Sequence, residues 1–91
     1  MTIIVRFEPR NMNADTYTEV MRRLDAAGAS RPPGRIHHAC YGPPEAVHVI
    51  DVWDTPDSFR AFGATLVPIL TALGVVLPEP FVAPVHNLVR G

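Results

Sequence analysis

The segment from residue 47 to residue 59 constrains the fold more than any other part of the chain, because a clear strand leads directly into a clear helix start. Residues 47–53 are mostly apolar and rich in β-branched side chains, which favours a strand. Thr55 is a typical helix N-cap, Pro56 takes the first helical position, and Asp57 complements the helix dipole. The segment therefore predicts a strand that turns at once into a helix.

This second helix is predicted to have one buried face and to end near Gly74. Glycine is a common residue just past a helix end. Pro68 lacks a backbone N–H and is expected to kink the helix. The buried stripe is expected to consist of Phe59, Phe62, Leu66, Leu70 and Leu73.

The N-terminal part of the chain predicts another strand followed by another helix. Residues 2–8 alternate in the manner of a strand, with Ile3, Val5 and Phe7 on one face. Asn13 can cap a helix that Gly28 ends. The apolar face of this helix is expected to carry Tyr17, Val20, Met21 and Leu24.

Two further strands are predicted at residues 35–41 and at about residues 81–89. The order of elements is then β-α-β-β-α-β, which is typical of the ferredoxin-like α+β fold. We expect a four-stranded antiparallel sheet with both helices on one face. The length of 91 residues fits one domain, spanning residues 1–91.

Composition excludes several function classes. The net charge of −1 offers no basic surface for nucleic acid or anionic membranes. A single cysteine, Cys40, excludes an internal disulfide and suits the reducing cytoplasm. The N-terminal residues do not resemble a signal peptide, and no apolar run is long enough to span a bilayer, so a cytoplasmic protein is expected. Its glycines form no nucleotide-binding loop.

Two helices can cover only one face of the predicted sheet. The other face is expected to be too apolar for water and too polar for a plain core, which favours a homodimer that encloses a cavity between two sheets. The helix-covered set is expected to be Ile3, Val5, Phe7, Ile50, Val52, Val85 and Val89. The opposite set is expected to be Ile4, Arg6, Val47, Val49, Asp51, Trp53, Val82, His86 and Leu88.

Asp51 and Trp53 are two residues apart, so their side chains should share one face of the strand. A buried carboxylate is costly unless a partner satisfies it. Arg6 on the neighbouring strand would make Asp51 structural, whereas His86 on the last strand would make it part of a catalytic pair. Trp53 would either stack on an aromatic substrate or fill the dimer core.

His38 is the second histidine candidate, and Ile36 and Cys40 should share its face. The alternation does not decide which face of the sheet that is. A metal site built from His38, Asp51 and His86 is an alternative, but no histidine or cysteine motif with ligand spacing is present. We therefore expect no metal and no cofactor.

Together these elements and motifs resemble the dimeric α/β-barrel superfamily, and most of all its small antibiotic-biosynthesis-monooxygenase-like proteins. The resemblance implies a homodimer joined through its sheet faces, with a cavity in each subunit. The group contains cofactor-free oxygenases, isomerases, haem-degrading enzymes and proteins without assigned activity, so the fold alone constrains function weakly. The motifs concerned are Gly34-x-x-x-His38, Asp51-Val52-Trp53-Asp54, Phe59-x-x-Phe62, Leu66-Val67-Pro68 and Pro84-Val85-His86-Asn87.

The leading hypothesis is a cofactor-free homodimeric enzyme that acts on an apolar, aromatic or polyketide-like molecule. His86 or Asp51 would remove a proton, and the resulting anion would react with dioxygen. An isomerase or lyase using the same base, a non-catalytic ligand-binding dimer and a buried network that fixes dimer register are the alternatives. The expected site consists of His86, Asp51 and His38 for catalysis and Trp53, Arg6, Val49 and Leu88 for substrate binding.

Overall fold

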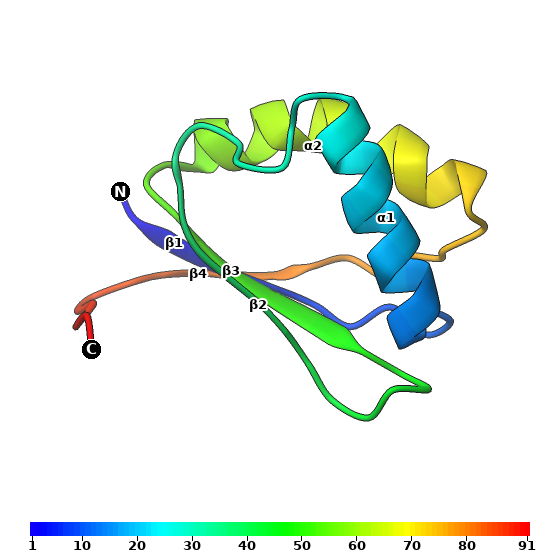
Figure 1. Ribbon diagram of the computed structural model, residues 1–91. Coiled ribbons are helices and arrows are strands. Elements are labelled where there is room, and N and C mark those ends of the chain that lie inside the picture. Colours follow the sequence, from blue (N-terminus) through cyan, green and yellow to red (C-terminus); the bar gives the residue numbers. More distant parts are fainter.

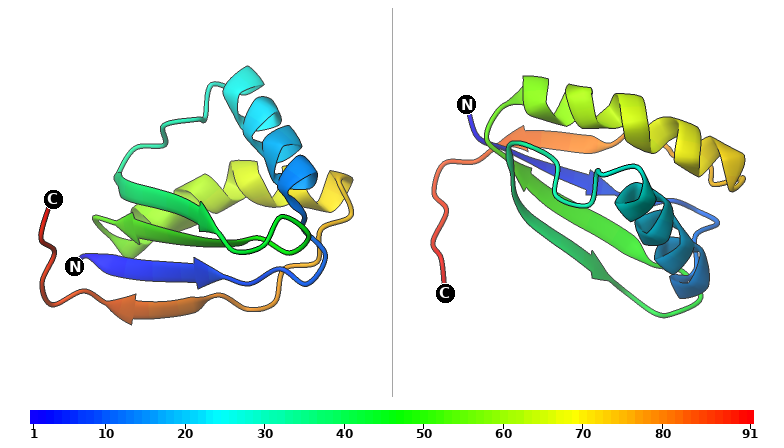
Figure 2. Two further views of the ribbon diagram at one scale, coloured as in Figure 1. Left: turned by 60° about the horizontal axis from the view of Figure 1, so that its bottom comes forward. Right: turned by 45° about the horizontal axis from the view of Figure 1, so that its top comes forward.

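The computed structural model describes all residues from 1 to 91 and confirms the predicted order of elements (Figure 1). The helices lie on one face of the sheet, and the opposite face carries no helix (Figures 1 and 2). The strands are β1 (Ile3–Phe7), β2 (Arg35–Tyr41), β3 (His48–Trp53) and β4 (Phe81–Pro84), and the helices are α1 (Ala14–Ala26) and α2 (Pro56–Ala72).

The sheet is antiparallel throughout, with the strand order β2-β3-β1-β4. β1 and β3 lie in the middle, so their residues are flanked by strands on both sides. This arrangement is the ferredoxin-like α+β fold, as predicted.

Both helices begin at the residues that the sequence indicates. The Asn13 side chain accepts a hydrogen bond from the Thr16 amide at 2.8 Å, and the Thr55 hydroxyl accepts one from the Ser58 amide at 3.1 Å. These bonds satisfy amides that a helix N-terminus leaves without partners. α2 continues past Pro68 to Ala72. Neither α1 nor α2 has the length and the continuous apolar character of a membrane-spanning helix.

The core lies between the helices and the inner face of the sheet. Ile3, Val5 and Phe7 are buried there, which confirms the predicted inner face of β1. The other large contributors are Val20 and Leu24 from α1, Phe62 and Leu70 from α2, and Val49 and Trp53 from β3.

The predicted facing of β3 is wrong. Residues opposite one another in an antiparallel pair share a face, and the register pairs Asp51 with Val5 and Trp53 with Ile3. Asp51 and Trp53 therefore face the helices, together with Val49, while Ile50 and Val52 face the open side. The carboxylate can occupy the inner face because a partner on β2 satisfies it there.

The last strand is shorter than predicted, and its facing also differs. β4 ends at Pro84, so His86 and Leu88 lie in the exposed C-terminal segment beyond it. Val82 pairs with Val5 and therefore lies on the helix-side face, not on the open face. The amide of Val85 still donates to the Thr2 carbonyl at 2.9 Å, and beyond this bond the chain leads away from the sheet (Figure 1).

Candidate active site

The central feature of the site is a contact between His38 and Asp51, which the register of β2 and β3 places directly opposite one another. The Nδ1 atom of His38 lies 2.5 Å from the Oδ1 atom of Asp51. Asp51 is only 3% exposed and is the one charged residue among the buried ones. A short hydrogen bond to a carboxylate is among the stronger polar contacts in proteins, which explains how an acid is tolerated here.

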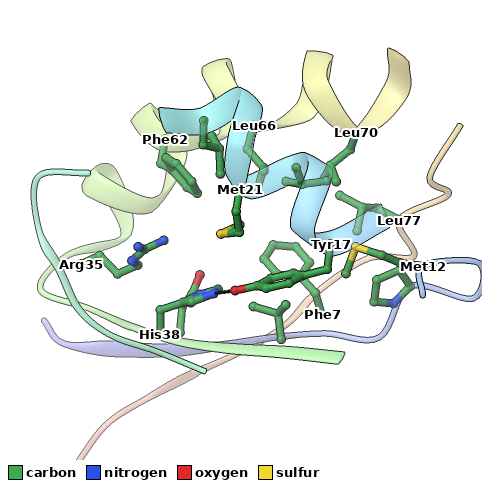
Figure 3. Close-up of a pocket in the computed structure, with 15 residues that line it drawn as sticks. Phe7, Met12, Tyr17, Met21, Arg35, His38, Phe62, Leu66, Leu70 and Leu77 are labelled. Atoms are coloured by element: carbon green, nitrogen blue, oxygen red, sulfur yellow. Dashed lines mark hydrogen bonds and ion pairs between the residues drawn. The ribbon is translucent and has the colours of Figure 1, made fainter. Parts of the chain in front are cut away.

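The second ring nitrogen of His38 is bound by α1. The Tyr17 hydroxyl oxygen lies 2.6 Å from Nε2, and the two rings are nearly parallel, 8° apart, with centroids separated by 5.9 Å (Figure 3). Tyr17 lies on the same helix face as the buried Val20 and Leu24, so helix packing holds its ring against the sheet. Asp51, His38 and Tyr17 thus form a continuous hydrogen-bonded chain.

The raised pKa of Tyr17 indicates which atoms donate and which accept in this hydrogen-bonded chain. Burial raises the pKa of the Tyr17 phenol above its usual value; Cys40 and Asp51 raise it further, and Arg35 opposes the rise. Tyr17 is therefore a neutral phenol at physiological pH and can donate to His38. In the neutral imidazole, Nε2 then accepts from Tyr17 while Nδ1–H donates to the Asp51 carboxylate.

The hydrogen-bonded chain of Asp51, His38 and Tyr17 opens onto an apolar cavity between the sheet and the two helices (Figure 3). The cavity volume is about 40 Å³, enough for a few water molecules and well below the ~300 Å³ or more of typical ligand pockets. Its polar groups come from Tyr17, Arg35, His38 and Asp51. The remaining lining residues are Phe7, Pro9, Met12, Val20, Met21, Leu24, Val49, Phe62, Leu66, Leu70 and Leu77.

The other sequence-predicted residues lie apart from this chain. Arg6 is exposed, pairs with Glu8 at 3.1 Å and stacks over Phe81 at 4.9 Å, so the expected Asp51–Arg6 pair is not formed. His86 and Leu88 are in the exposed C-terminal segment. The histidine that meets Asp51 is accordingly His38 and not His86.

Trp53 and Val49 both occupy the inner face, but only Val49 lines the cavity. Trp53 is fully buried between β3 and α2, with its ring centroid 5.4 Å from that of Phe62 and 5.9 Å from that of Phe59. Trp53 therefore takes neither of the two expected roles, substrate contact or dimer core, because it packs in the core of the chain itself. Its Nε1 atom has no hydrogen-bond partner.

The chain offers no group of three or more His, Cys, Asp or Glu side chains placed to hold a metal ion. Cys40 lies on the inner face opposite Val49, and burial raises the pKa of its thiol. A raised pKa keeps the thiol protonated, which does not suit a nucleophile.

Two residues of the site were missed by the sequence analysis. Tyr17 was expected only as part of the apolar helix stripe, and the sequence signal for more was its hydroxyl, the one polar tip on that stripe. Arg35 was expected only as the start of a strand. Its position depends on an irregularity in the sheet that no local pattern reveals.

Comparison with solved structures gives the same fold over almost the whole chain. The cofactor-independent oxygenase SnoaB from Streptomyces nogalater matches with a TM-score of 0.62 and 24% identity, over 99% of this chain and 96% of its own. A candidate antibiotic biosynthesis monooxygenase from Chloroflexus aurantiacus matches with a TM-score of 0.61 and 20% identity, over 99% and 97% of the two chains. This chain has the antibiotic-biosynthesis-monooxygenase-like fold.

A third protein with the monooxygenase-like fold, a candidate from Deinococcus radiodurans, matches with a TM-score of 0.61 and 13% identity, over 99% and 97% of the two chains. No protein-family model matches the sequence, and no curated protein sequence does so. The predicted resemblance is thus confirmed at the level of the fold.

Proposed function

We propose that the chain is a small cofactor-free enzyme in which His38 acts as a general base on an aromatic substrate. The observation that carries this proposal is the hydrogen-bonded chain from Asp51 through His38 to Tyr17 at an apolar cavity. An imidazole held by a buried carboxylate on one nitrogen presents its other nitrogen as a proton acceptor. The likeness in fold to a cofactor-independent oxygenase supports the same reaction class.

In the proposed reaction, a hydroxyl of the substrate replaces the Tyr17 hydroxyl at Nε2 of His38. The proton passes to Nε2, and the Asp51 carboxylate stabilises the imidazolium that forms. Such general-base catalysis contributes a factor of about 10²–10⁴ to the rate. The apolar walls keep water from the substrate anion.

Dioxygen is the co-reactant in the oxygenase version. The electron-rich anion of a substrate with an activated CH₂ group transfers electrons to O₂ and forms a carbon–oxygen bond, giving a hydroperoxide. The imidazolium protonates the peroxide, and the neutral His38 then removes the remaining C–H proton as the O–O bond breaks. The departing hydroxide takes up that proton, so that R₂CH₂ and O₂ yield R₂C=O and H₂O. Four electrons leave the carbon and four reduce O₂, so the step needs no reductant and no metal.

The cavity must widen before such a substrate can bind. Met12 and Met21 line it, and methionine side chains rearrange readily. A ligand-binding protein without chemistry is the second candidate, because an apolar cavity with a few polar groups can select a ligand without reacting with it. An isomerase or lyase using the same base would not consume oxygen.

We also propose that a second copy of the chain covers the open face of the sheet. The register places Ile4, Ile50, Val52, Ala39 and Ala83 on that face, beside Tyr41 and Phe81. Tyr41 and Phe81 are both exposed, and exposed apolar patches of this kind mark interaction sites. Sedimentation tests the dimer: Ile50→Asp should shift it to a monomer, whereas wild-type protein that is monomeric at micromolar concentration would contradict it.

The enzyme proposal is tested by the oxidation of a probe compound in air and under nitrogen. The probe is 1,8-dihydroxyanthrone, a phenol with an activated CH₂ group, and the quantity measured is its rate of oxidation above the spontaneous rate. We expect turnover in air, none under nitrogen, and a loss of about 10²-fold or more in His38→Gln. His86→Gln, in the exposed C-terminal segment, is the control. Binding of the probe without any turnover would favour the ligand-binding candidate.

A further inference from the structure

An irregularity in β2 turns one more charged residue into the cavity. The pairing with β3 is regular from Tyr41 back to His37, but Arg35 then pairs with Trp53 while His37 pairs with Val52. One extra residue, Ile36, is therefore inserted in β2. Such a bulge is a known way to re-aim a side chain next to an active site.

The bulge changes which side chains share a face. In a regular strand, residues three apart such as Arg35 and His38 point to opposite faces. With the extra residue between them, both lie on the helix-covered face and line the same cavity. Figure 3 shows Arg35 on the side of His38 away from Tyr17, at the end of the cavity below Phe62.

The guanidinium of Arg35 lacks an acidic partner in this position. Its Nη2 atom donates to the Ser30 carbonyl at 3.0 Å, and its central carbon lies 5.7 Å from the centroid of the Phe62 ring. A guanidinium has five N–H donors, so most of them have no protein acceptor. Asp51, the acid that also lines the cavity, is engaged by His38.

The other arginines show how unusual this is. Arg6, Arg22, Arg23 and Arg60 each pair with a glutamate or aspartate, and Arg10, Arg31 and Arg90 are exposed to water. Arg35 has no acidic partner, and it is less exposed than these three because it lies against an apolar cavity. A partly buried cation beside an apolar cavity is stabilised when an anion binds it.

We infer that Arg35 binds a carboxylate of the substrate, which makes the substrate an aromatic acid that also carries the hydroxyl taken by His38. This rests on the proposed function, because the hydroxyl is positioned at the proposed base. The planar fork of a guanidinium matches a carboxylate through two parallel hydrogen bonds. Arg35 would thereby orient the aromatic ring between the two polar ends of the cavity.

A matched pair of small ligands tests this inference. The probes are 4-hydroxybenzoate and 4-hydroxybenzamide, which have nearly the same shape and differ in charge, and binding is followed by NMR titration. In the wild type we expect the acid to bind about tenfold to a hundredfold more tightly than the amide. Arg35→Gln should abolish the preference, and Arg35→Lys should keep part of it because the charge remains.

The exposed Arg31→Gln serves as the control for loss of one positive charge and should keep the full preference. Equal affinity of the wild type for both probes, or a preference that survives in Arg35→Gln, would overturn this inference and leave the proposed base untouched. Failure of both probes to bind would instead contradict the aromatic pocket, and the inference would fall with it. If Arg35→Gln does not fold, the wild type alone tests the inference. A preference for the acid that salt weakens supports it, and no preference for the acid overturns it.

Discussion

His38 and Asp51 are directly opposite one another on adjacent strands, with Nδ1 of the imidazole 2.5 Å from Oδ1 of the carboxylate. The sheet itself fixes this contact, because the register of β2 on β3 sets the position of both backbones. A site built on paired strands is held more precisely than one built on loops. The pair is thus positioned before any ligand arrives.

The first prediction concerns the carboxylate. Asp51→Asn removes the charge that orients the imidazole and stabilises its protonated form, so activity should fall by about 10²–10⁴-fold. Loss of a charge-assisted hydrogen bond should also lower the free energy of unfolding by about 1.5–3 kcal/mol. Urea unfolding and steady-state rates measure the two effects. Asp25→Asn, at an exposed position on α1, should change neither; full activity in Asp51→Asn would refute the role.

A second prediction separates Tyr17 from the base. Tyr17→Phe removes the hydroxyl that occupies Nε2 of His38, so a phenolic ligand no longer competes with it. We expect tighter binding of 4-hydroxybenzamide, together with a loss of about 0.5–1.5 kcal/mol in the free energy of unfolding. Calorimetric titration and urea unfolding give the two values. Weaker binding in Tyr17→Phe would show that the hydroxyl contacts the ligand instead.

The third prediction is a dependence of stability on alkaline pH. The pKa of Tyr17 is raised in the folded protein relative to the usual 10.0, mainly by burial. The unfolded chain therefore loses this proton first as the pH rises. Stability from this group is complete below pH 10.0 and falls as the pH rises toward the folded value.

This fall is measured by urea unfolding between neutral and strongly alkaline pH. It should be smaller in Tyr17→Phe, which has no phenol at this position to titrate. In the wild type, the tyrosinate absorbance of Tyr17 should appear at a higher pH than that of an ordinary tyrosine. This absorbance should be missing from the spectrum of Tyr17→Phe. An identical alkaline loss of stability in wild type and variant would contradict the prediction.

The fourth prediction concerns the turn that leads into β2. Gly34 has a φ of +87°, and a Cβ atom there would overlap the side chains of Asp54 and Ser58. Gly34→Ala should therefore lower the free energy of unfolding by about 1–3 kcal/mol. Gly63→Ala meets no atom within 4 Å and lies inside α2, so it should raise stability by about 0.5–1 kcal/mol. Thermal unfolding compares the two variants, and equal stability of both would contradict the steric argument.

Much of the fold could be predicted because its signals are local. The caps at Asn13 and Thr55, and the stops at Gly28 and Gly74, depend on a few neighbouring residues. Both glycines adopt the positive φ that a helix end favours. The alternation of β1 identified its inner face correctly.

The site was predicted only in part. His38 and Asp51 are both sequence-predicted candidates, and Asp51 has the polar partner that a buried carboxylate requires. The partner was misassigned because the last strand was expected to reach His86, whereas β4 ends at Pro84. The face of β3 was inverted because alternation shows which residues share a face but not which face the helices cover.

The sequence by itself determined the order of elements, the helix ends and, outside the bulge in β2, which residues within a strand share a face. These depend on backbone propensities and on side-chain alternation, and both act over a few residues. Only the tertiary structure decided which face of β3 the helices cover, where the extra residue Ile36 lies, and that Tyr17 meets His38. Those choices depend on hydrogen-bond register and packing between segments that are distant in the chain. Asp51 is therefore part of an inner polar chain because of its neighbours across the sheet.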